Sequence, residues 1–164
     1  MLQIFFVMTR EEKFMLAAVA LGVQGMRSNA GGPFGCVIVK DDVIVGSGCN
    51  NVLATNDPTA HAEVVAIRDA CKNLNNFQLV GCEIYATCEP CPMCMGAIYW
   101  ARPAKVYFAN SKQDAADIGF DDSFIYSEIS LPPEERKIIL QCMQMDEAKN
   151  MFEEWKTMNN KTLY

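Results

Sequence analysis

The stretch TCEPCPMC, residues 87–94, contains a C-x-x-C pair preceded by proline, at the point where a predicted strand gives way to a predicted helix. Cys91 and Cys94 are three positions apart, so one helical turn brings both sulfur atoms to the same side. The helix N-terminus favours the thiolate forms that bind metals. This stretch therefore predicts a metal site at the start of a helix.

The stretch DPTAHAE, residues 57–63, places the only histidine of the chain, His61, near the start of another predicted helix. Zinc takes about four ligands in a tetrahedral array, and a catalytic zinc site leaves one position for water. With His61, Cys91 and Cys94 as ligands, that fourth position stays open. The sequence therefore predicts one Zn²⁺ per subunit, with water as the fourth ligand.

Glu63 follows His61 by two residues and is not needed as a ligand, so it is free to move protons. Water on zinc can have a pKa of about 7, which makes hydroxide available for attack on an amidine-like ring carbon. The pairing of H-x-E with P-C-x-x-C is typical of zinc deaminases. We therefore expect hydrolytic deamination with Glu63 as the proton shuttle.

Two non-catalytic interpretations of the same cysteines remain open. Cys88 as a fourth ligand would close the zinc site and make it structural, although such a site has no use for Glu63. The order Cys88, Cys91, Cys94 also matches the start of a ferredoxin iron–sulfur motif, but the C-x-x-x-C-P continuation does not follow. Either site would belong to a zinc or iron–sulfur interaction module.

Chain length and composition indicate a single domain. A chain of 164 residues with 51% hydrophobic composition buries one core. The apolar residues 1–7 are far short of the roughly 20 needed to cross a bilayer, and we expect no membrane partner. We expect residues 1–8 to be an N-terminal extension and residues 9–164 the domain. Eight cysteines without a secretion signal favour a cytoplasmic location.

Hydrophobic periodicity predicts alternating helices and strands, which favours an α/β layered domain with a partly parallel sheet. Thr9 and Glu12 form a capping-box pattern. Asp57 and Thr59 are candidate caps of the second helix, which places His61 in its first turn. The predicted helices are 9–26, 60–74, 91–101 and 146–158, with a helical turn at 114–117, and the predicted strands are 34–39, 43–48, 82–87, 105–109 and 138–142.

Further stretches resemble the cytidine deaminase superfamily. They are GGPFG at 31–35, the pair Asn50-Asn51, NDPTAHAE at 56–63 and CEPCPMC at 88–94. Within the superfamily, MGAIYWARP at 95–103, GFDDSFIY at 119–126 and the terminal residues 161–164 are similar to the bacterial guanine deaminases. The likeness runs from about Thr9 to the last residue. Cys36 and Cys49 depart from the family pattern.

The resemblance implies a three-layer α/β/α sandwich with a five-stranded mixed sheet. It also implies a homodimer in which a C-terminal segment, about residues 143–164, is exchanged between subunits. The implied reaction converts guanine to xanthine and ammonia by attack of zinc-activated water on C2, with Glu63 as proton shuttle. The partner is then a small purine base.

The same resemblance implies roles for four more residues. Asn50 would hydrogen-bond the purine, Phe34 would pack on its ring, and Tyr164 would close the pocket of the partner subunit. Asp122 would bind the amino edge and assist proton relay; a carboxylate suits the N1 and N2 donors of guanine and disfavours adenine. Each has a plain alternative: Phe34 as core, Asn50 as a turn cap, Asp122 as a solvated loop acid.

The nearest rival is a transfer-RNA adenosine deaminase, which shares the predicted zinc motif. The chain has 14 basic and 20 acidic residues, a formal net charge of −6, and no basic run. Such a surface repels a polyanion, so we expect no nucleic-acid partner.

Overall fold

The computed structural model describes residues 8–164, so the predicted extension 1–8 lies outside the described residues except for Met8. The chain divides into two compact units, one ending at Asp122 and the other spanning Ser123–Tyr164. Each unit is described by itself.

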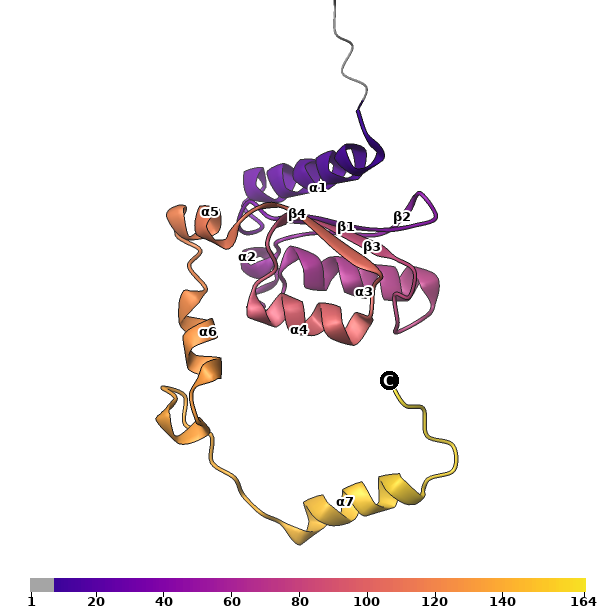
Figure 1. Cartoon of the computed structure of the whole chain (residues 1–164), viewed down its shortest axis with the longest axis vertical. Coiled ribbons are helices and arrows are strands. Elements are labelled where there is room, and N and C mark those ends of the chain that lie inside the picture. The colour runs from indigo at the N-terminus through magenta and orange to yellow at the C-terminus, as the bar shows by residue number, and fades with distance from the viewer. Residues whose placement is uncertain (1–7) are drawn as a thin grey trace, which may run out of the picture. The chain divides into compact units, whose positions relative to one another are not determined.

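The first unit alternates helices and strands in the order expected from the sequence (Figure 1). The Thr9–Glu12 capping box forms as predicted at the start of its first helix. A four-residue helix after the second strand was not predicted, because it is a single turn between the turn-forming residues Asn51 and Asn56. The elements are α1 (Arg10–Arg27), β1 (Gly35–Lys40), β2 (Val43–Cys49), α2 (Val52–Thr55), α3 (Ala62–Leu74), β3 (Glu83–Cys88), α4 (Pro92–Ala101), β4 (Lys105–Asn110) and α5 (Lys112–Asp117).

The strands form one mixed sheet in the order β2-β1-β3-β4. β1 pairs antiparallel with both β2 and β3, whereas β3 and β4 are parallel. The crossover between the two parallel strands is α4, which therefore begins at the carboxyl end of β3. This connection places the start of α4 at one edge of the sheet, where the cysteine motif lies.

Helices cover both faces of the sheet, which gives this unit the expected three layers (Figure 1). Alternate side chains of β1 point to opposite faces. Cys36 and Ile38 join a core with α3 and α4, and Val37 and Val39 join a second core with α1. Both cores are buried, so the sheet holds the helix starts in fixed positions.

The absence of a side chain at Gly48 on β2 allows α3 to lie close to the sheet. A Cβ atom there would lie 2.5 Å from the Ala62 carbonyl oxygen and 2.7 Å from the Ala66 nitrogen. Real Cβ atoms do not approach backbone so closely. Gly48 therefore sets how near the first turn of α3, with Glu63, approaches the strands.

The second unit contains α6 (Ser123–Ser130), the 3₁₀ turn η1 (Pro133–Glu135) and α7 (Asp146–Thr157). None of its residues is buried. The α7 helix confirms the predicted helix 146–158 to within one residue, whereas α6 lies where no helix or strand was predicted. Among residues 8–164 no helix has the length and hydropathy that a bilayer span requires.

The predicted strand at 138–142 is wrong, and the sheet of the described residues has four strands rather than five. The apolar residues Ile138, Ile139 and Leu140 suggested a strand, but they are exposed here. A strand is stable only beside a partner that accepts and donates its backbone hydrogen bonds. No ladder among the described residues includes this segment.

Candidate active site

The start of α4 brings two cysteine sulfur atoms together. Cys91 is the N-cap residue, with extended backbone angles, and Pro92 follows at the first helical position, where its missing N–H costs nothing. Cys94 lies one turn later and is fully buried. The backbone N–H of Met95 donates to the Cys91 carbonyl at 2.8 Å, which closes this first turn.

The start of α3 supplies the third predicted ligand. His61 is the N-cap residue of α3, whereas the sequence placed it inside the first turn. Asp57 caps the preceding turn instead: it accepts hydrogen bonds from the Thr59 N–H at 2.8 Å and from the Thr59 hydroxyl at 2.7 Å. Two helix N-termini therefore converge, each with a predicted ligand at its cap.

The three predicted ligands form a compact cluster. His61 Nδ1 lies 3.5 Å from Cys91 Sγ and 3.5 Å from Cys94 Sγ. All three ligand atoms lie within 4.8 Å of one another. Tetrahedral zinc with ordinary Zn–S and Zn–N bond lengths separates such nitrogen and sulfur ligands by about 3.6 Å. The donor set and its spacing therefore fit Zn²⁺, with Nδ1 as the histidine ligand atom.

Electrostatics in the cluster favour a charged Cys91. Hydrogen bonding from Cys94, together with His61, lowers the pKa of Cys91 to about 4, although burial acts in the opposite direction. Hydrogen bonding to Cys91 raises the pKa of His61. The first negative charge of the pair therefore lies on Cys91, as a metal-binding thiolate requires.

Glu63 lies in the first turn of α3 and is buried, with 8% of its surface exposed. Burial is the main cause that raises its pKa, the charge of Cys91 raises it further, and His61 and a hydrogen bond with Cys94 lower it. A carboxylate with a raised pKa accepts and returns protons more readily near neutral pH. Its place beside the cluster suits proton transfer.

Cys88 is not part of the cluster. Its Sγ lies 3.6 Å from the Ser111 carbonyl oxygen, to which it donates. Burial raises the pKa of this thiol to about 11. In the described part of the chain the metal-ligand group consists of His61, Cys91 and Cys94 alone. The closed four-ligand site and the three-cysteine iron–sulfur arrangement are therefore not supported.

Backbone and side-chain hydrogen bonds hold the edge of the sheet on which the cluster lies. Asn110 Nδ2 donates to the Thr87 carbonyl at 2.8 Å, which ties the ends of β3 and β4. Glu89 Oε2 accepts the backbone N–H of Lys112 at 3.2 Å. These contacts fix the path of the chain into α4 and into α5.

The structure brings Phe34 and Asn50 together. The Asn50 backbone N–H donates to the Phe34 carbonyl at 3.0 Å, and Asn50 Oδ1 accepts the Val52 N–H at 3.2 Å. Asn50 is 5% exposed, and Phe34 packs against the core beneath α3 and α4. Phe34 is therefore partly a core residue, and Asn50 does accept a hydrogen bond within a turn, as the two alternative interpretations expected.

Phe120 was missed in the sequence. Its ring lies 5.0 Å from that of Phe34, edge to face at 87°. An aromatic residue in a loop long after β4 gives no local signal that it packs on Phe34. The stretch GFDDSFIY, which carried the family likeness, was the available hint.

Asp122 is partly buried at the end of the first unit. Burial raises the pKa of Asp122, and the negative charge of Cys91 raises it further, so the Asp122 carboxyl group interacts electrostatically with the predicted metal ligands. This environment differs from that of a fully solvated loop acid.

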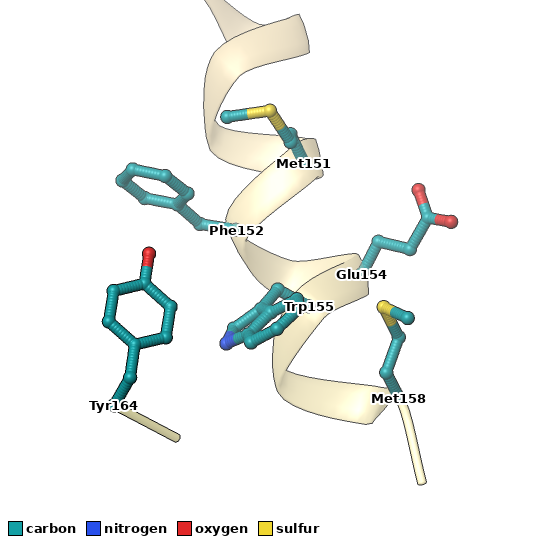
Figure 2. Close-up of a pocket in the computed structure, with 6 residues that line it drawn as sticks. All are labelled: Met151, Phe152, Glu154, Trp155, Met158 and Tyr164. Carbon is teal, nitrogen blue, oxygen red and sulfur yellow. The ribbon is translucent and has the colours of Figure 1, made fainter. Parts of the chain in front are cut away.

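Tyr164 belongs to the second unit, where it faces α7. Figure 2 shows its ring on the same side of the helix as Phe152 and Trp155. A pocket in this unit is lined by Met151, Phe152, Glu154, Trp155, Met158 and Tyr164.

A family model for the cytidine and deoxycytidylate deaminase zinc-binding region matches residues 8–110. The chain belongs to this family. The match includes the His61, Cys91 and Cys94 cluster, so the metal of this family and the donor set of the site agree on zinc.

Within this family, the chain is more similar to guanine deaminase than to the transfer-RNA adenosine deaminases. Guanine deaminase of Bacillus subtilis is 54% identical over 153 residues, which are 93% of this chain and 98% of that protein. An X-ray structure of guanine deaminase from the same organism, with the same identity and coverage, has a TM-score of 0.91. A transfer-RNA-specific adenosine deaminase of Haemophilus influenzae is 42% identical over 55% of this chain and 56% of its own length. The chain is therefore a homologue of guanine deaminase, and its likeness to the transfer-RNA enzymes is weaker.

Proposed function

We propose that this protein converts guanine and water to xanthine and ammonia. The observation that carries the proposal is 54% identity to guanine deaminase over 98% of that protein. A match of 153 of the 164 residues extends through residues 119–126 and into the C-terminal segment. The transfer-RNA adenosine deaminase match covers about half of either chain, and the net charge of −6 disfavours RNA.

His61, Cys91 and Cys94 would hold Zn²⁺, which would make a water molecule nucleophilic at neutral pH. Glu63 takes the proton that the attacking water loses as the C2–O bond forms. It passes this proton to the ring nitrogen. It then takes the second proton, from the hydroxyl group now on C2, and passes it to the amine, which leaves as ammonia as the C2–N bond breaks and the C2 carbonyl forms. The burial of Glu63 keeps bulk water from competing as the proton carrier.

Phe34, Asn50 and Asp122 bind the purine in this proposal. Phe34 offers a ring for packing, and Asn50 offers the Nδ2 donor because its Oδ1 already accepts the Val52 N–H. Asp122 accepts from the N1 and N2 donors of guanine and assists the proton relay. Adenine has an acceptor at N1 and would leave this carboxylate unpaired.

The proposed assembly is a homodimer that exchanges the C-terminal segment, about residues 143–164, so that Tyr164 closes the pocket of the partner subunit. The α7 helix has large exposed apolar side chains, including Phe152 at 67% and Met151 at 59%, and it buries none within its own unit. An amphipathic helix gains stability by covering that face. In the proposed dimer a second copy of the chain covers the apolar face of α7. Each subunit then consists of its own first unit and the C-terminal segment of its partner.

A cytoplasmic location fits the thiol chemistry. All eight cysteines are unpaired, and two of them serve as thiolate ligands. Reducing compartments keep such thiols available.

Ammonia release from the zinc-loaded protein tests the substrate. Guanine, guanosine, adenine, cytosine, cytidine and transfer RNA are offered in parallel, with the Glu63→Gln variant as the control. We expect release from guanine that is lost in the variant. Release from transfer RNA or adenine in place of guanine would contradict the proposed substrate while keeping the zinc chemistry.

A further inference from the structure

The loop before β1 contains two adjacent glycines, and the first of them lies against Asn50. A Cβ atom on Gly31 would collide with Asn50 Oδ1, and it would lie 2.7 Å from the Asn50 carbonyl oxygen and 2.9 Å from Cγ. All three atoms belong to one residue. The space that a side chain at position 31 would need is therefore occupied by the Asn50 carboxamide and backbone.

Asn50 and this loop are both anchored, so neither yields easily. Val52 donates its N–H to Asn50 Oδ1 at 3.2 Å, and the Asn50 N–H donates to the Phe34 carbonyl at 3.0 Å. On the glycine side, the Ala30 carbonyl accepts the N–H of Leu53 at 3.0 Å. Rotation of the Asn50 carboxamide relieves the closest contact, because that group is the end of a side chain. The 2.7 Å contact with the Asn50 carbonyl oxygen requires a small backbone shift as well.

The backbone at position 31 does not itself require glycine. The glycines with positive φ among the described residues are Gly81 and Gly119, so Gly31 does not have the left-handed φ that favours glycine. The constraint at Gly31 is therefore its neighbour Asn50, whose carboxamide oxygen is the closest atom and whose backbone carbonyl oxygen is the next, and not a left-handed φ at position 31.

We propose that Gly31 is a positioning residue: its lack of a side chain sets the orientation of the Asn50 carboxamide, and through it the binding of the purine. The inference rests on the proposed function, in which Asn50 donates to the base. Gly31 does not touch the substrate and acts only through Asn50.

Gly32 and Gly96 provide contrasts. A Cβ on Gly32 would meet ring-edge atoms, Phe120 Cζ at 2.8 Å and Phe34 Cε2 at 2.9 Å, and rings tilt more easily than backbone shifts. A Cβ on Gly96 in α4 would meet nothing within 4 Å. Gly96→Ala is therefore the matched control for adding one methyl group.

Steady-state kinetics on guanine compare Gly31→Ala, Asn50→Ala, the double variant and Gly96→Ala, each with its zinc content. We expect Gly31→Ala to raise KM about tenfold or more while kcat changes less than about threefold, as for a misplaced ground-state contact. The double variant should match Asn50→Ala, because the two changes act through one group. The proposal would be overturned if KM in the double variant rose by the product of the two single-variant increases. An unchanged KM in Gly31→Ala would also overturn it.

A second measurement does not depend on guanine turnover. In protein labelled with ¹⁵N-asparagine, the Asn50 side-chain amide signal is assigned by its loss in Asn50→Ala. We expect this signal to shift in Gly31→Ala and to stay in place in Gly96→Ala. A signal unmoved in Gly31→Ala would refute the positioning role, whereas absence of guanine turnover in the unchanged protein would refute only the proposed function.

If Gly31→Ala does not fold, thermal unfolding of the Gly31→Ala/Asn50→Ala variant decides. Removing the carboxamide relieves the main collision, so recovery of a cooperative transition supports the proposal. A double variant that also fails to fold would contradict it.

Discussion

The helix starts that carry His61 and Cys91 are packed within a buried core, whereas the C-terminal unit has no core of its own. The helix starts lie against a sheet that is covered by helices on both faces, and a hydrogen bond from Asn110 joins the ends of β3 and β4. In the C-terminal unit, residues 123–164, no residue is buried, although the helices carry large apolar side chains. The first region thus has its stability within one chain, whereas the second needs a surface that it does not itself supply.

The largest expected effect is the loss of a metal ligand. Cys94→Ala should remove bound zinc and lower kcat/KM on guanine by at least about 10⁴-fold, because the activated water is lost. Mass spectrometry under native conditions measures the bound zinc, and steady-state kinetics on guanine measure kcat/KM. Cys88→Ala is the matched control on the same stretch, and it should keep one zinc per chain; zinc lost in this control would restore the four-ligand interpretation.

Asp122→Asn should have the next largest effect. The amide presents a donor where guanine also presents donors, so kcat/KM should fall about 10²-fold or more while zinc stays bound. The neighbouring change Asp121→Asn is the control, with an expected change of less than about threefold. Equal losses in both variants would mean that the loop, rather than one carboxylate, recognises the base.

A mixing experiment sharpens the contrast between the two regions. Glu63→Gln and Tyr164→Ala chains are unfolded together and refolded as a mixture. If Tyr164 completes the partner's site, half of the dimers are mixed and each has one intact site, so activity should recover to about a quarter of the unchanged protein. Tyr164→Ala alone should retain about a tenth. A mixture no more active than the average of its two components would place Tyr164 in its own subunit's site or outside the mechanism.

The metal site was predictable because its signal is local. His61, Cys91 and Cys94 occupy the caps or first turns of helices, and helix starts follow short-range patterns of proline and capping residues. Even there the helix begins two residues later than predicted, at Ala62, with His61 as its N-cap, because Asp57 and Thr59 are hydrogen-bonded to each other in the preceding turn. Helix boundaries depend on such competing hydrogen bonds.

Other features were not predictable because they depend on contacts distant in sequence. The packing of Phe120 on Phe34 and the collision space at Gly31 arise from loops that meet only in the folded chain. The strand expected at 138–142 failed for the same reason, since an apolar run specifies a strand only when a partner strand is adjacent. The α3 and α4 helices bury their own faces and were predicted to within a few residues.

The most direct test of a zinc-dependent guanine deaminase is to titrate zinc into the metal-free protein while xanthine formation from guanine is followed by ultraviolet absorbance. We expect activity to rise in proportion to zinc and to level off at one ion per chain. The Glu63→Gln variant should bind the same amount of zinc and form almost no xanthine. One bound zinc per chain with no xanthine from the unchanged protein would contradict guanine as the substrate.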